Sequence, residues 1–156
     1  MSGKLIVSFI VLTALIAGIS IYYLQVYAFY EELPPETVQI QLTGLNTREP
    51  EPILTDAVQA IDSDSSPLRF RACFTTELTR EALGEAFVAY ENPEPLTGPR
   101  WFDCYDAAAV GAALENGEAT AYLAQPNIRD GVDRVIAVFD DGRAYAWHQL
   151  NEKYQD

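Results

Sequence analysis

The pattern of apolar and polar positions divides the chain into two parts. Residues 5–24 (LIVSFIVLTALIAGISIYYL) carry no charged side chain. A helix rises about 1.5 Å per residue, so a run of this length spans the roughly 30 Å hydrocarbon core of a bilayer. The run predicts a transmembrane helix within an N-terminal anchor, residues 1–30. The following EELPPE, residues 31–36, contains two prolines and is interpreted as a juxtamembrane linker.

The remaining residues, 37–156, alternate short apolar segments with turn-forming residues. Alternation of apolar and polar positions predicts strands at 37–43, 68–74, 87–90, 119–124, 133–139 and 144–149, with a further short apolar segment at 101–104. Asp141-Gly142 predicts a tight hairpin between the last two strands. Residues 44–67 are poor in periodicity and are expected to form an irregular connection.

Two helices complete the pattern, at 77–85 and 107–115, with Thr76 and Asp106 as the expected N-caps. A domain with this mixture of elements is expected to be α+β. It would consist of an antiparallel sheet of four to six strands with both helices on one face.

Charge is distributed unevenly along the chain. Lys4 is the one cationic side chain before residue 31, so nine Lys and Arg residues face 23 Asp and Glu residues beyond it, a net charge near −14. Nucleic-acid binding needs clustered positive charge and is therefore excluded. The acidic domain is suited instead to a basic protein partner.

The same distribution predicts an orientation in the membrane. By the positive-inside rule, the short N-terminus with Lys4 stays cytoplasmic and the domain lies on the far side. A cleaved signal peptide is the alternative, with a small-residue site at residues 26–28. The apolar run exceeds the 7–15 residues of a typical signal peptide, and aromatic residues follow it as in an interfacial belt. Both features favour an uncleaved signal anchor.

The two cysteines, Cys73 and Cys104, both fall in the domain. In an oxidising compartment an even count favours one disulfide. Two free buried cysteines, a redox pair or a metal pair are the alternatives, but the spacing forms no CxxC motif. Two sulfurs with one histidine also leave a four-ligand zinc site incomplete.

Catalytic chemistry has few candidates. His148 is the single histidine, and no GxSxG nucleophile motif precedes it. An enzyme would have to pair His148 with a carboxylate such as Asp103 or Asp133 as acid and base. The acidic run at residues 62–66 begins like a calcium loop but lacks its glycine and glutamate positions. The sequence therefore predicts neither a cofactor nor a metal site.

Tyr145 and Trp147 lie on one face of the last predicted strand, opposite alanines and His148. If the helices cover the alanine face, the two aromatic side chains are a candidate interaction surface, since Tyr and Trp are preferred interface anchors. If not, they form the core. Both interpretations stay open at this level.

Three motifs carry a resemblance to a known family: SPLRFRACF at 66–74, WFDCYDA at 101–107 and the segment 127–154. With the single leading span, the chain resembles short membrane proteins of Rhodobacter-type alphaproteobacteria, a family without assigned activity. The resemblance implies a bacterial inner membrane and a periplasmic domain. The leading hypothesis is a non-enzymatic accessory or interaction protein of an envelope complex; a periplasmic ligand-binding or sensory module and a hydrolase-type enzyme are the alternatives.

Overall fold

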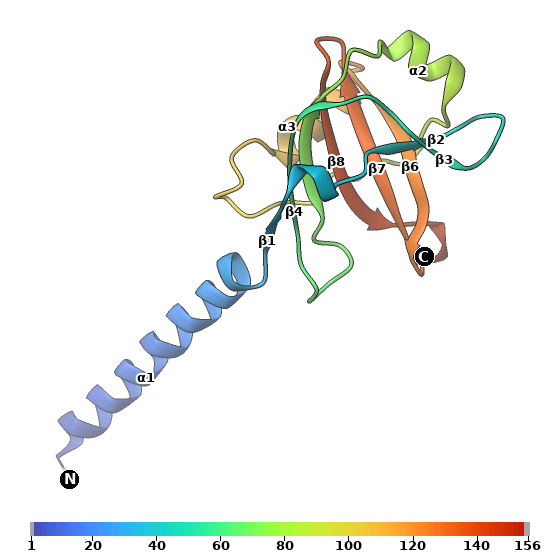
Figure 1. Ribbon diagram of the computed structural model, residues 1–156. Helices are drawn as coiled ribbons and strands as arrows, with labels where there is room; N and C mark the ends of the chain where they lie inside the picture. Colours follow the sequence, from blue (N-terminus) through green and yellow to red (C-terminus); the bar gives the residue numbers. More distant parts are fainter. Residues whose placement is uncertain (1, 155–156) are drawn as a thin grey trace. The chain divides into compact units, whose positions relative to one another are not determined.

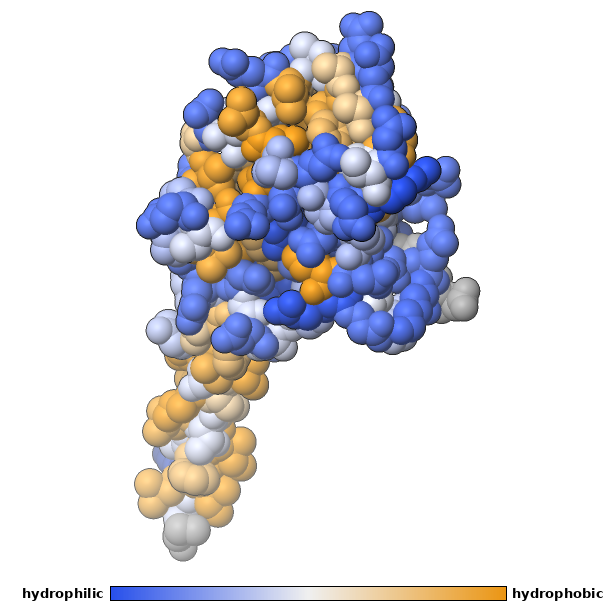
Figure 2. Space-filling model, turned by 45° about the vertical axis from the view of Figure 1, so that its right-hand side comes forward, coloured by the Kyte–Doolittle hydropathy of each residue, from blue (hydrophilic) through white to orange (hydrophobic). Residues whose placement is uncertain are grey.

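The computed structural model describes residues 2–154 and divides into two compact units, with the boundary between Tyr30 and Glu31. The first unit is a helix, α1 (Gly3–Tyr23), extended by a π-helical turn at Leu24–Ala28 (Figure 1). Its large apolar side chains are exposed along the helix, which is hydrophobic over most of its surface in Figure 2. Length and composition fit a membrane-spanning anchor.

The second unit begins directly at Glu31, so residues 31–36 are not the linker that the sequence suggested. β1 (Glu31–Leu33) pairs antiparallel with β4 (Asp56–Asp62), and a 3₁₀ turn follows at Pro35–Thr37. The two prolines end the strand rather than mark a free connection, because proline donates no backbone hydrogen bond to a sheet.

In the described part of the chain, six strands form one antiparallel sheet in the order β1-β4-β5-β8-β7-β6. The other members are β5 (Arg71–Thr75), β6 (Ala119–Arg129), β7 (Val132–Phe139) and β8 (Arg143–Leu150). β7 and β8 form the predicted hairpin, closed by Asp141-Gly142. The α+β class and the antiparallel sheet are confirmed.

A two-stranded ribbon lies over one face of the sheet (Figure 1). It consists of β2 (Gln41–Thr43) and β3 (Pro50–Pro52), which occupy only part of the predicted strand 37–43 and of the expected irregular segment. Residues 87–90 join the ribbon to β6, because Val88 N–H donates to the Thr43 carbonyl and Leu123 N–H donates to the Val88 carbonyl. The predicted strand at 87–90 is thus a pair of isolated bridges.

The two helices of the domain lie against opposite faces of the sheet, not together on one face. α2 (Arg80–Ala86) buries Leu83 in the same core cluster as Ala146. α3 (Ala107–Glu115) follows Tyr105, whose ring contacts Tyr145 on the other face. Neighbouring residues of a strand point to opposite faces, so both faces of β8 are covered. Helical periodicity in the sequence could not decide which face each helix would choose.

β4 is the longest of the strands that sequence periodicity missed. Ala57 has a positive φ of 52°, and the register with β5 shifts between Asp56 and Gln59. This bulge inserts an extra residue and so breaks the apolar–polar alternation on which the prediction depends. Residues 101–104, by contrast, are turns rather than extended chain.

Candidate functional site

His148 is buried and fixed by two hydrogen bonds. Arg134 Nε donates to His148 Nε2 at 3.0 Å, and His148 Nδ1 lies 2.7 Å from the carbonyl oxygen of Pro67. An arginine can only donate, so Nε2 accepts and the ring proton sits on Nδ1, facing Pro67. Burial, then the positive charge of Arg134, lowers the pKa of His148 to about 3.

These contacts do not support His148 as a catalytic acid or base. Its accepting nitrogen is occupied by a cation, and its proton is held by a backbone carbonyl. Neither candidate partner is hydrogen-bonded to it: Asp133 accepts hydrogen bonds elsewhere, and Asp103 lies on the surface. The structure brings His148 together with Arg134 and with Phe70, whose ring stacks on the imidazole with centroids 4.8 Å apart.

Trp147 is fully buried, so the interpretation of Tyr145 and Trp147 as an interaction surface is wrong for Trp147. The indole N–H donates to Gln149 Oε1 at 2.9 Å. Tyr145 is half-buried between the rings of Tyr105 and Phe139. The alternative that this face of β8 is core was therefore the correct one, because the loop at residues 91–105 covers it.

Buried polar side chains hold that loop in place. Arg71, which is 2% exposed, donates to the carbonyls of Leu96 at 2.8 Å and Thr97 at 3.0 Å. Gln149 accepts from Glu94 N–H at 2.8 Å and donates to the Asn92 carbonyl. The disulfide between Cys73 and Cys104 ties the end of the loop to β5, with Cα atoms 6.2 Å apart.

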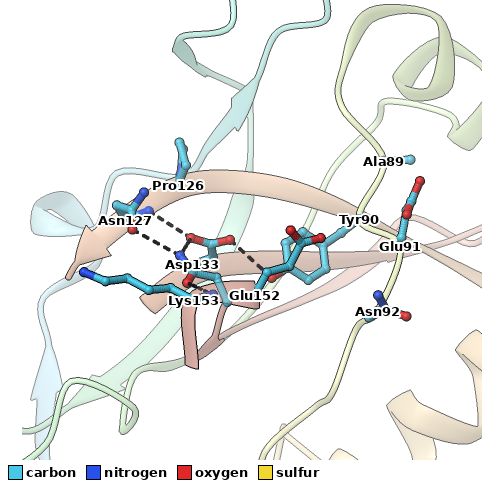
Figure 3. Close-up of a pocket in the computed structure, with 10 residues that line it drawn as sticks. Ala89, Tyr90, Glu91, Asn92, Pro126, Asn127, Asp133, Glu152 and Lys153 are labelled. Atoms are coloured by element: carbon cyan, nitrogen blue, oxygen red, sulfur yellow. Dashed lines mark hydrogen bonds between the residues drawn. The ribbon is translucent and has the colours of Figure 1, made fainter. Parts of the chain in front are cut away.

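A polar hollow of about 490 Å³ lies beside this loop, and we call it the Asp133 hollow. Its lining includes Tyr90, Glu91, Asn127, Asp133, Glu152 and Lys153 (Figure 3). Asp133 is 7% exposed, and its carboxylate accepts three hydrogen bonds, from Asn127 N–H at 2.9 Å, Asn151 Nδ2 at 2.9 Å and the Tyr90 hydroxyl at 3.2 Å.

The charge in the hollow is negative. Burial and the nearby carboxylate of Asp133 raise the pKa of Tyr90, with smaller contributions from Glu152 and Glu94. Lys153 does not neutralise the hollow, because its ammonium group is paired with Asp130, 2.6 Å away. Figure 3 shows Lys153 pointing away from Tyr90. The hollow therefore presents the carboxylate of Asp133 with those of Glu91 and Glu152, and its one lining cation, Lys153, is paired with Asp130.

Sequence reasoning considered Asp133 only as a partner of His148 and missed this hollow. Its donors come from three segments, near residues 90, 127 and 151, that are separated in the sequence. Asn127 has a φ of 47°, a conformation that asparagine tolerates better than most residues. The only local sequence signal for this site was Asn127, which follows Pro126 near a turn.

No metal site emerges from the described residues, 2–154, in which no three ligating side chains gather. The acidic run at 62–66 forms a turn instead, with Asp62 accepting from Ser63 N–H and the hydroxyls of Ser63 and Ser65 in contact.

Comparisons with known proteins give a family but no activity. No curated protein and no solved structure matches the chain. A family model matches residues 40–156, three quarters of the chain. The predicted membership of an uncharacterised family is confirmed, whereas its restriction to one bacterial group stays a prediction. The chain belongs to DUF6446, a family of unknown function.

Proposed function

We propose that the protein is a single-pass inner-membrane protein whose periplasmic domain acts by docking a basic segment of a second envelope protein. The apolar helix supplies the anchor, and the folded acidic domain supplies the binding surface. The observation that carries the proposal is the Asp133 hollow, in which a rigid buried carboxylate is surrounded by unneutralised negative charge.

The charge balance of the whole domain favours such a partner. After residue 30 the chain carries 23 acidic and nine basic residues, and three of the basic residues are already paired within the domain, at Arg80–Asp140, Arg143–Asp141 and Lys153–Asp130. Most carboxylates therefore lack a cationic partner within the described chain. An excess of one charge steers an oppositely charged protein and raises its association rate.

The hollow is suited to a lysine or arginine side chain of the partner. Glu91 and Glu152 are exposed at its edge, and Asp133 lies at its floor beside the ring of Tyr90. A carboxylate and an aromatic ring together bind an ammonium or guanidinium group through charge-assisted hydrogen bonds and cation–π contact. Because Asp133 is already held by three donors, the partner would meet a preorganised group.

Co-purification of the full chain in mild detergent tests the proposal. We expect a stoichiometric protein partner, which dissociates at high salt because the contact is electrostatic. The double variant Glu91→Gln, Glu152→Gln should weaken its recovery roughly tenfold. Glu81→Gln with Glu85→Gln is the matched control, since it removes the same charge from exposed positions of α2.

Recovery of the protein alone, as a monomer in several mild detergents, would contradict the docking role. If both double variants lose the partner equally, the net charge of the domain binds the partner, and the assignment of the binding site to the Asp133 hollow is overturned.

A further inference from the structure

A second pocket, of about 320 Å³, lies where the loop 63–67 meets the end of the β6–β7 hairpin. We call it the Arg134 pocket; its lining includes Asp62, Asp64, Ser66, Arg129, Arg134 and His148. The pocket is separate from the Asp133 hollow, because Asp133 and Arg134 are neighbours in β7 and so leave opposite faces of the sheet.

Arg134 is held rigidly in this pocket. Its guanidinium carbon lies 3.9 Å from the ring centroid of Phe70, and its Nε donates to His148. Nη1 makes only a long contact, 3.5 Å, with the Gln39 carbonyl. Neutral His148 and an aromatic face fix the position of the cation without cancelling its charge.

The charge of Arg134 is also incompletely balanced. Within residues 2–154, no carboxylate comes within 4 Å of its guanidinium group. Burial lowers the pKa of Arg134 to about 10, and the charge of Asp62 offsets this only in part. Arg134 is partly buried, and a partly desolvated charge without a close partner is costly, so such a group attracts an anion from outside.

The other charged side chains of the Arg134 pocket limit the kind of ligand that it can bind. Arg129, exposed at the edge of the pocket, adds a second guanidinium group, while Asp62 and Asp64 add two carboxylates. Burial raises the pKa of Asp62, whereas the charges of Arg134 and Arg129 act in the opposite direction. Two cations beside two carboxylates disfavour a multiply charged anion and match a ligand that carries both signs.

We infer that the Arg134 pocket binds a free α-amino acid, with its carboxylate on Arg134 and Arg129 and its ammonium group on Asp62 and Asp64. A volume of about 320 Å³ is at the small end of ligand pockets and suits a molecule of this size. Because Nε of Arg134 is bonded to His148, the carboxylate would accept from the remaining N–H groups of Arg134 and from the guanidinium group of Arg129. This activity goes beyond the proposed docking function and does not depend on it.

Isothermal titration of the full chain in detergent, with the common L-amino acids one at a time, tests the inference. At least one should bind. Arg129→Gln should weaken its binding about tenfold or more, because Arg129 is exposed and its loss leaves the fold intact. Arg100→Gln, which removes an exposed guanidinium group elsewhere on the domain, should bind as the wild type does.

A second variant tests the ammonium contact. Asp62→Asn should weaken binding of the amino acid but strengthen binding of its deaminated analogue, such as propionate in place of alanine, because one repulsive carboxylate is removed. Failure of every amino acid to bind overturns the inference. Binding of inorganic phosphate or of phosphatidylethanolamine vesicles without any amino acid, or equal affinities of Arg129→Gln and Arg100→Gln, overturns it as well.

Discussion

At the scale of single residues, the buried side chains of Arg71 and His148 are bonded to backbone carbonyls of neighbouring loops. Arg71 donates to four carbonyls, including those of Leu96 and Thr97, and His148 faces the carbonyl of Pro67. Satisfied in this way, a buried polar group stabilises the loop it contacts, whereas its removal leaves orphaned acceptors. Loops without regular structure thereby gain fixed positions around the Asp133 hollow and the Arg134 pocket.

The neutral state of His148 makes a prediction about pH. Its pKa falls from 6.5 to about 3 on folding, so below pH 6.5 the unfolded chain takes up a proton that the folded chain does not. The contribution of neutral His148 to the free energy of unfolding is therefore fully present above about pH 6.5, and it is lost as the pH falls toward 3. We expect its contribution to the slope to approach 1.4 kcal/mol per pH unit at most.

Urea unfolding followed by tryptophan fluorescence, at several pH values, measures this effect. His148→Gln, which can still accept from Arg134 but does not titrate, should show a shallower loss of stability between pH 6.5 and 3. Identical slopes for the variant and the wild type would show that His148 titrates alike in both states.

Residue-level features were predictable where the signal was local. Asp106 caps α3, as expected, by accepting from the N–H groups of Ala108 and Ala109. The cap of α2 is Thr79 rather than Thr76, since the helix starts at Arg80. The burial of Trp147 was not predictable, because it depends on a loop that is far away in the sequence.

At the scale of elements, local turn chemistry decides the best-predicted part of the fold. Gly142 has a φ of 85°, and a Cβ atom there would lie 2.6 Å from the carbonyl oxygen of Thr76. The hairpin between β7 and β8 was predicted because only such a residue suits its turn. β2 falls within a predicted strand, but its pairing with β3 was not predicted, nor were β1, β3 and β4, because their pairing depends on a bulge and on contacts distant in the sequence.

Two glycine substitutions test this argument at the level of elements. Gly142→Ala should destabilise the domain by about 2–3 kcal/mol, from the left-handed backbone together with the contact to Thr76. Gly84→Ala in the middle of α2 is the matched control, since its Cβ would meet nothing within 4 Å. It should stabilise the domain by about 0.5–1 kcal/mol. Chemical unfolding measures both; equal effects would contradict the role of the turn.

At the scale of the whole molecule, the candidate sites could be predicted less well than the fold. Elements follow from periodicities of two and 3.6 residues, which the sequence displays directly. The Asp133 hollow and the Arg134 pocket instead gather residues from strands and loops that lie far apart in sequence. Their chemistry depends on which side chains remain unpaired, a property of the folded chain. Net charge was the one global feature that pointed to a partner.

The proposed orientation of the anchor, with the domain on the far side of the membrane, depends on the charge around the span. Lys4 is the only basic side chain before the span, so moving positive charge across it should oppose translocation. Under the proposed orientation, maleimide labelling of Cys73 and Cys104 in the wild type should fail until reductant is added, because the periplasm lets the disulfide form. In the variant Lys4→Gln, Glu31→Lys, Glu32→Lys, part of the protein should remain cytoplasmic and label without reductant, whereas Lys4→Arg should behave as the wild type.

The disulfide closes a loop spanning 31 positions and should stabilise the domain by about 3–4 kcal/mol. The labelled fraction, which lacks the disulfide, should therefore also unfold at a lower urea concentration. Full protection of both cysteines in the triple variant would show that charge around the span does not set the orientation.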